Sequence, residues 1–133
     1  MKAKFMSPPL PPHTWSRKFA VAFEGLSQTF RTQSSLRVHC VCGILVVALA
    51  AVTGVSPLEW AILLLAIGFV ISMELFNTAI EAIVDLISPE HADLARITKD
   101  AAAAAVLVSA MTSVLVGCAV FLPHWGPQLG LWN

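Results

Sequence analysis

The sequence predicts an all-α membrane protein in which an amphipathic N-terminal helix precedes three transmembrane helices. Hydrophobic residues make up 57% of the 133 positions and charged residues only 12%, with a mean hydropathy of +0.78. A soluble domain carries about 25% charged residues, so water cannot be the solvent for most of this surface. The apolar residues also form three runs, each long enough to cross a hydrocarbon core of about 30 Å with help from flanking turns.

The N-terminal region predicts a tail followed by an amphipathic helix. Residues 1–14 are expected to be flexible, because prolines occupy the place where a signal peptide has its apolar core. Ser16 is a suitable N-cap for a helix that continues to about Gln33. Its apolar residues form one stripe and its charges lie mostly off that stripe, as in a helix at a membrane interface. Packing on protein is the alternative. The stripe consists of Phe19, Phe23, Leu26 and Phe30.

Three spans follow along the chain. The first covers about residues 38–52, and the second begins near Trp60 after Pro57, a residue suited to the first helical position. The helical pattern of the second persists to about Ile87. The third covers about residues 101–122, and residues 123–133 form a short C-terminal tail. Residues 15–122 are therefore expected to form one membrane domain.

The positive charges predict the orientation. All eight Lys and Arg residues lie either at or before Arg37 or in the segment between the second and third spans, as Arg96 and Lys99. The positive-inside rule then places the N-terminus and residues 88–100 in the cytoplasm and the C-terminus outside. The formal net charge is zero, so nothing points to nucleic acid.

One face of the second span carries acidic and amide side chains. Glu74, Asn77, Glu81 and Asp85 are spaced i, i+3, i+7 and i+11, which places them within about 60° of each other on a helix. If Trp60 marks the outer interface, Glu74 lies about 21 Å inward, and Glu81 and Asp85 lie about 32 and 38 Å inward. The stripe is thus expected to begin in hydrocarbon and to end among the cytoplasmic headgroups.

This pattern favours phosphate chemistry at the membrane surface. A carboxylate in hydrocarbon costs roughly 3 kcal/mol, so it indicates function. Clustered carboxylates repel each other unless a cation lies among them, and Mg²⁺ both prefers such oxygen ligands and brings nucleotide phosphates. Lys99 and Asp100, next to small residues at the start of the third span, lie at the same level, and Lys99 could reach a phosphate. A polar seam that only holds helices together is the structural alternative.

Two motifs carry a resemblance to a known family. Residues 74–85, ELFNTAIEAIVD, match E-x-x-N-S/T-A-I-E-x-x-V/I-D, and the stretch that begins with Lys99 and Asp100 matches K-D-x-A/G-A/S-A-A-V. Residues 15–122 thereby resemble the integral-membrane prokaryotic diacylglycerol kinase and undecaprenol kinase family. Arg37 and His39 fit weaker positions, although His39 is otherwise expected simply at a helix start near the interface.

The resemblance implies an activity and a role for each site residue. It implies a homotrimeric helical bundle in the bacterial cytoplasmic membrane that transfers phosphate from ATP to a membrane lipid alcohol, diacylglycerol or undecaprenol. Glu74 would be the general base and Glu81 would hold Mg²⁺. The other matched residues would contact phosphates or support the nucleotide: Asn77, Asp85, Lys99 and Asp100.

One position departs from the family pattern. Family members usually carry a glutamate that shares the metal with the position of Glu81, and here that position is Gln33. An amide oxygen can bind Mg²⁺ but supplies no negative charge. A weak or inactive family member that acts as a membrane scaffold or lipid-binding protein is therefore the alternative. An ion-conducting trimer is disfavoured, because the acidic stripe lies too close to one interface.

Overall fold

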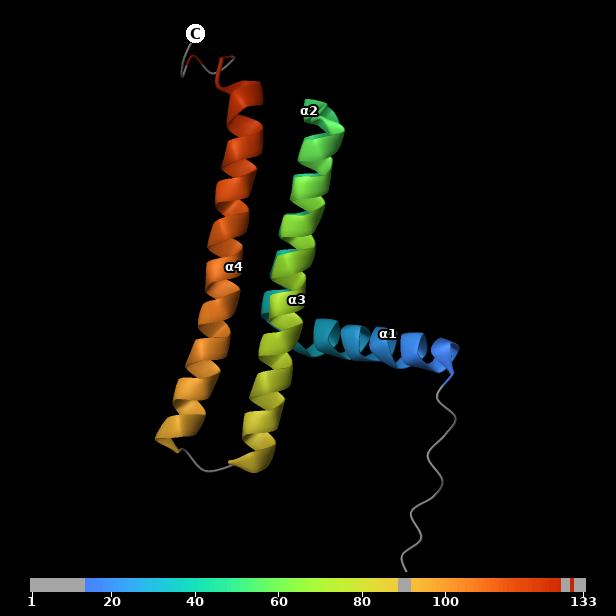
Figure 1. Cartoon of the computed structure of the whole chain (residues 1–133), viewed down its shortest axis with the longest axis vertical. Coiled ribbons are helices and arrows are strands. Elements are labelled where there is room, and N and C mark those ends of the chain that lie inside the picture. The colour runs from blue at the N-terminus through green and yellow to red at the C-terminus, as the bar shows by residue number, and fades with distance from the viewer. Residues whose placement is uncertain (1–13, 89–91, 128–129, 131–133) are drawn as a thin grey trace, which may run out of the picture.

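The protein consists of four helices in chain order. The computed structural model describes residues 14–88, 92–127 and 130, so residues 1–13 of the predicted tail lie outside the described part. The fold class predicted from the sequence is confirmed (Figure 1). The helices are α1 (Trp15–Thr32), α2 (Ser34–Thr53), α3 (Pro57–Ile87) and α4 (Asp93–Trp125).

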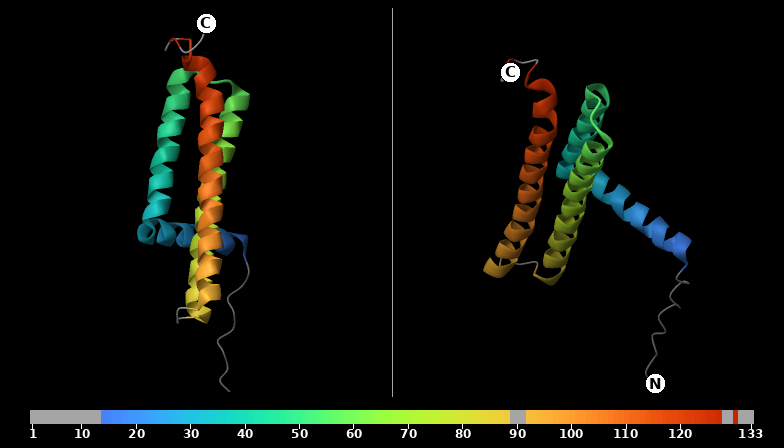
Figure 2. Two further views of the ribbon diagram at one scale, coloured as in Figure 1. Left: turned by 90° about the vertical axis from the view of Figure 1, so that its left-hand side faces the viewer. Right: turned by 45° about the horizontal axis from the view of Figure 1, so that its top comes forward.

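Three of the helices form a bundle, and the first leaves it sideways. Helices α2, α3 and α4 run side by side, and α1 projects from the start of α2 at a steep angle (Figures 1 and 2). The corner is Gln33, whose extended backbone (φ −99°, ψ 116°) interrupts the helical hydrogen bonding. No residue of α1 is buried, and its aromatic side chains Trp15, Phe19, Phe23 and Phe30 are all exposed.

The start of α3 follows the sequence prediction. Pro57 occupies the first turn, where its missing N–H removes no helical hydrogen bond. The Glu59 N–H donates to the Ser56 hydroxyl at 3.4 Å, and the Ser56 N–H donates to the Glu59 carboxylate at 2.7 Å. This reciprocal capping box fixes the turn between α2 and α3.

Helices α2, α3 and α4 are each long and apolar enough to cross a membrane. Large apolar side chains stay exposed along them, including Ile44, Leu65 and Leu115. The cluster of buried apolar residues that pack together is small and lies at the end of the bundle away from α1, around Leu63 and Val120. An apolar exterior with a small core is what a lipid environment requires, and the chain is a membrane protein.

The helix ends correct three predictions. Helix α1 begins at Trp15 with Thr14 as its N-cap residue, so Ser16 is not the cap. Helix α4 begins at Asp93, well before residue 101, and it continues through Pro123 to Trp125. Lys99 therefore lies within the helix and not in a loop. Hydropathy marks the part of a helix that lipid surrounds, whereas the polar turns outside that part can be equally helical.

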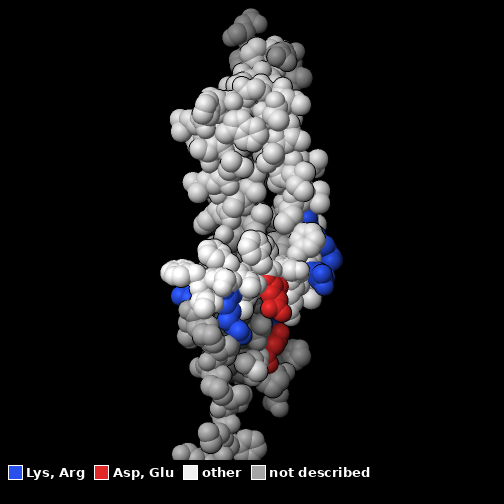
Figure 3. All heavy atoms as spheres, turned by 90° about the vertical axis from the view of Figure 1, so that its right-hand side faces the viewer, with Lys and Arg blue, Asp and Glu red and all other residues white. Residues whose placement is uncertain are grey.

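Helix length distinguishes the two ends of the bundle. The 20 residues of α2 extend about 30 Å, one hydrocarbon thickness, whereas the 31 residues of α3 extend about 46 Å. The excess lies beyond α1, where α3 and α4 continue past it (Figure 1). On the face that Figure 3 shows, the charged side chains gather in the lower part and the surface above them is uncharged. The ends of α3 and α4 beyond α1 carry the ion-paired side chains Asp85, Arg96, Lys99 and Asp100 and form a polar extension.

Candidate active site at the α1 end of the bundle

Glu74 is the buried carboxylate of the site. Its side chain is 3% exposed, and it faces the first two turns of α2. The Ser35 hydroxyl donates to Glu74 Oε2 at 2.9 Å, and His39 Nε2 lies 3.1 Å from Glu74 Oε1. Both carboxylate oxygens are therefore held by one neighbouring helix, which fixes the orientation of the group.

The sequence of α2 explains this contact. Ser35 and His39 are four residues apart, so they lie on one face of the helix. Gly43 continues that face, and a Cβ atom there would approach Ile67 Cγ2 to 3.0 Å. The missing side chain lets α2 and α3 pack closely enough for the polar side chains one turn away to reach Glu74. Leu36, which is 0% exposed, seals the same corner.

Asn77 and Glu81 form a second, separate contact. Asn77 Nδ2 donates to Glu81 Oε1 at 2.8 Å. Asn77 Oδ1 is buried and has no hydrogen-bond partner. A buried acceptor without a partner is costly, so this oxygen is suited to a donor or cation supplied by a ligand.

The polar extension carries two ion pairs. Lys99 Nζ lies 2.5 Å from Asp85 Oδ1 across the α3–α4 hairpin, and Arg96 pairs with Asp100 at 3.1 Å within α4. Both pairs are largely solvent-exposed and each contributes at most about 1 kcal/mol to stability. Because such pairs exchange partners easily in water, Lys99 remains able to bind an incoming phosphate.

The polar side chains that share one face of α3 therefore make separate contacts: Glu74 contacts α2, Asn77 contacts Glu81, and Asp85 contacts Lys99. Along a helix, seven residues correspond to about 10.5 Å, so Glu74 and Glu81 cannot hold one ion together. Among the described residues, no three His, Cys, Asp or Glu side chains gather as metal ligands. Gln33 lies at the α1–α2 corner, and no hydrogen bond joins its side chain to Glu81 in the described part of the chain. Glu81 and Asn77 Oδ1 are the oxygen ligands that this face of α3 can offer a cation, and Mg²⁺ commonly uses only one or two carboxylates of a protein.

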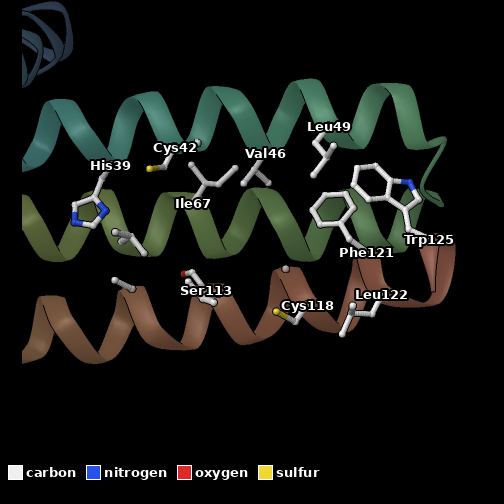
Figure 4. A pocket seen from close by; sticks show the side chains of 15 residues that line it. His39, Cys42, Val46, Leu49, Ile67, Ser113, Cys118, Phe121, Leu122 and Trp125 are labelled. Atoms are coloured by element: carbon white, nitrogen blue, oxygen red, sulfur yellow. The ribbon is translucent and has the colours of Figure 1, made fainter. Parts of the chain in front are cut away.

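An apolar groove begins at His39, which contacts Glu74, and continues into the span. It has a volume of about 490 Å³ and is lined by α2, α3 and α4 (Figure 4). His39 stands at one end and Trp125 at the other, and the α4 wall from Ala110 to Trp125 extends about 22 Å. The groove has the volume of a small-molecule site and the length of a lipid chain.

Sequence analysis missed the partners of Glu74. Ser35 had no assigned role, and His39 was expected at a helix start near the interface and as a weaker position of the family pattern, without a partner. The available signal was their i, i+4 spacing at the start of an apolar helix, which puts two polar groups on one face. That signal does not say which neighbouring helix the face meets, so the contact with Glu74 could not be inferred.

The fold and the site define a class of protein: a helical membrane protein with a buried carboxylate where an apolar groove meets a charged extension. The model of the family described as prokaryotic diacylglycerol kinase matches residues 20–121. The chain belongs to this family and is a lipid kinase.

Curated relatives agree with the family assignment. The chain is 41% identical to the undecaprenol kinase of Bacillus subtilis over 80% of its own length and 87% of the relative. It is 39% identical to the diacylglycerol kinase of Synechocystis over 79% of its length and 61% of that protein. It is 30% identical to the diacylglycerol kinase of Escherichia coli K12 over 79% of its length and 86% of the relative.

Proposed function

We propose that this chain transfers the γ-phosphoryl group of Mg-ATP to the hydroxyl of undecaprenol or diacylglycerol at the cytoplasmic interface of a bacterial inner membrane. One observation carries the proposal. Glu74 is a buried carboxylate in contact with His39, which lines one end of an apolar groove, and α3 continues from Glu74 into a charged, water-facing extension. A reaction between a lipid and a soluble nucleotide needs a site that is accessible from both the membrane and water.

The lipid enters from the membrane side. Its hydrocarbon chain lies in the groove, whose walls are almost wholly apolar, and its hydroxyl reaches Glu74. Glu74 accepts the hydroxyl proton as the oxygen attacks the γ-phosphorus and ADP departs. Each carboxylate oxygen accepts more than one hydrogen bond, so the contacts with Ser35 and His39 leave room for the hydroxyl.

The nucleotide binds from the aqueous side. Glu81 and Asn77 Oδ1 would hold Mg²⁺, with the Gln33 amide as a further oxygen ligand, and the ion would neutralise the phosphate charge. Lys99 leaves Asp85 to bind a phosphate, while Asp85 and Asp100 support the nucleotide end. The cytoplasmic location of this end follows from the positive-inside rule, and the homotrimer follows from the family resemblance.

The test measures phosphate transfer in membranes that contain the full chain. Labelled ATP and Mg²⁺ are supplied with undecaprenol or with diacylglycerol, because relatives of both names match this chain. Label is expected in the lipid product, and Glu74→Gln is expected to lower the rate about 10²- to 10⁴-fold, the usual contribution of a general base. Glu59→Gln, which changes a carboxylate at the opposite end of α3, serves as the matched control.

A scaffold is the second candidate function, and Gln33 favours it because the expected metal-binding carboxylate is replaced. Under that alternative neither alcohol is labelled although the protein is folded. Label in lipid that persists in Glu74→Gln would instead show that another group takes the proton.

A further inference from the structure

Glu74 must lose its proton after each transfer. The side chain is 3% exposed and is not among the described residues that line the groove, so direct exchange with water is blocked. Its other contact, Ser35, is a hydroxyl that does not take up a proton at neutral pH. The reaction therefore needs a second group that removes the proton.

His39 has the chemistry and the position for this step. Within the part of the chain that the structure describes, it is the titratable side chain in contact with Glu74, at 3.1 Å from Nε2 to Oε1. Its side chain is 25% exposed and lies at the end of the groove opposite Trp125, so it can exchange a proton with the surroundings where Glu74 cannot. An imidazole accepts and releases protons near neutral pH, and its two nitrogens let a proton enter on one side and leave on the other.

We propose that His39 is a positioning and proton-relay residue that acts through Glu74. The step rests on the proposed function. The lipid O–H bond breaks and its proton goes to Glu74 Oε1, the lipid oxygen bonds to the γ-phosphorus, and ADP leaves with the electrons of the broken P–O bond. The proton then passes from Oε1 to His39 Nε2. Nε2 can accept because the neutral ring carries its own proton on Nδ1. The imidazolium so formed releases the Nδ1 proton to water or buffer, and Glu74 is again a carboxylate. Before the next turnover the ring loses its Nε2 proton and regains one at Nδ1 from water or buffer, which restores the starting tautomer.

The surroundings of His39 leave this role to no other described group. The other titratable side chains that line the same groove are Cys42 of α2 and Cys118 of α4, and no hydrogen bond joins either to Glu74 in the described part of the chain. Ser113 of α4 is neutral. The basic residues of the extension, Arg96 and Lys99, are paired with Asp100 and Asp85.

Two variants separate a relay from a purely structural contact. His39→Gln keeps a hydrogen-bond donor of similar reach but cannot carry a proton, and His39→Ala leaves space for free imidazole. Activity of the full chain is measured in lipid vesicles across the pH range in which imidazole titrates, at several buffer concentrations. His124→Gln is the matched control, because His124 contacts Glu59 at the same 3.1 Å at the far end of the bundle.

The relay predicts a change in turnover and not in binding. Both His39 variants should show a kcat at least about tenfold lower, within the range of proton-transfer catalysis, with KM for ATP and lipid unchanged. Added imidazole should restore His39→Ala and leave Glu74→Gln inactive. Circular dichroism and thermal melting of each variant verify folding.

Three outcomes overturn the relay. They are a wild-type kcat and pH profile in His39→Gln, failure of imidazole to restore His39→Ala, or a loss in His124→Gln as large as that in His39→Gln. Absence of lipid phosphorylation by the wild-type chain overturns the proposed function itself, so the two failures are distinguishable.

Discussion

Gln33 is the residue at which this chain is expected to depart from the family pattern, and its position makes that expectation testable. It lies in the extended corner between α1 and α2, with its side chain partly exposed. A carboxylate there would add a negative charge near the level at which the nucleotide is proposed to bind. Because Mg²⁺ binding improves with ligand charge, the amide should weaken the metal site without abolishing it.

Gln33→Glu is therefore expected to raise kinase activity several-fold at limiting Mg²⁺ and to lower the Mg²⁺ concentration at half-maximal rate. The measurement is a Mg²⁺ titration of the lipid-labelling rate. Gln28→Glu is the matched control, since Gln28 lies on the exposed surface of α1 and adds the same charge. An equal gain in both variants, or none in Gln33→Glu, would contradict this account of the site.

At the scale of residues, the periodicity of the sequence predicted which side chains of α3 share one face, but not which residues of other helices they contact. The spacing of Glu74, Asn77, Glu81 and Asp85 fixes a shared face of α3, because helix geometry is local. Whether each member meets a neighbour depends on contacts between helices. In the structure Glu74 contacts Ser35 and His39, and Asp85 contacts Lys99. These pairings could not be derived from spacing alone.

At the scale of elements, the contact between α2 and α3 controls the geometry of Glu74. Gly43 is the close point, one turn from His39, and Ile67 is its neighbour. A larger side chain at position 43 must separate the two helices or displace Ile67. Separation of the helices would draw His39 away from Glu74.

Gly43→Leu is expected to destabilise the protein by about 1–3 kcal/mol, the usual cost of overpacking, and to lower kinase activity. Thermal unfolding in detergent and lipid labelling measure the two effects. Gly68→Leu is the control in α3, because a Cβ atom there meets nothing within 4 Å. If Gly43→Leu and Gly68→Leu were equally stable and equally active, the close contact between α2 and α3 would not control the geometry of Glu74.

Helix ends show a second limit of the sequence. The start of α3 was predicted correctly, because Ser56, Pro57 and Glu59 form a local capping signal. The start of α4 was placed too late, since its N-cap residue Ala92 makes no side-chain cap and the first turns are polar. Where a helix lacks a capping residue, hydropathy reports only the membrane-embedded part.

At the scale of the whole molecule, the unequal helix lengths give the protein a polar end and an apolar end. Helix α2 matches one hydrocarbon thickness, and α3 and α4 extend past α1 on the side of the charged pairs. The sequence predicted three spans and a sided charge distribution. It could not show that the site lies where α1 meets the bundle, because that level is set by the Gln33 corner in three dimensions.

The orientation of this polar end can be tested with single cysteines. The background lacks Cys40, Cys42 and Cys118, and new cysteines replace either Leu58, exposed at the start of α3, or Asp93, exposed at the start of α4. If the basic end faces the cytoplasm, a membrane-impermeant maleimide should label Leu58→Cys in intact cells with a permeable outer envelope. It should label Asp93→Cys only after the inner membrane is opened. The reverse pattern would place Glu81, Asp85 and Lys99 on the side without ATP, and phosphorylation by a cytoplasmic nucleotide would then be excluded.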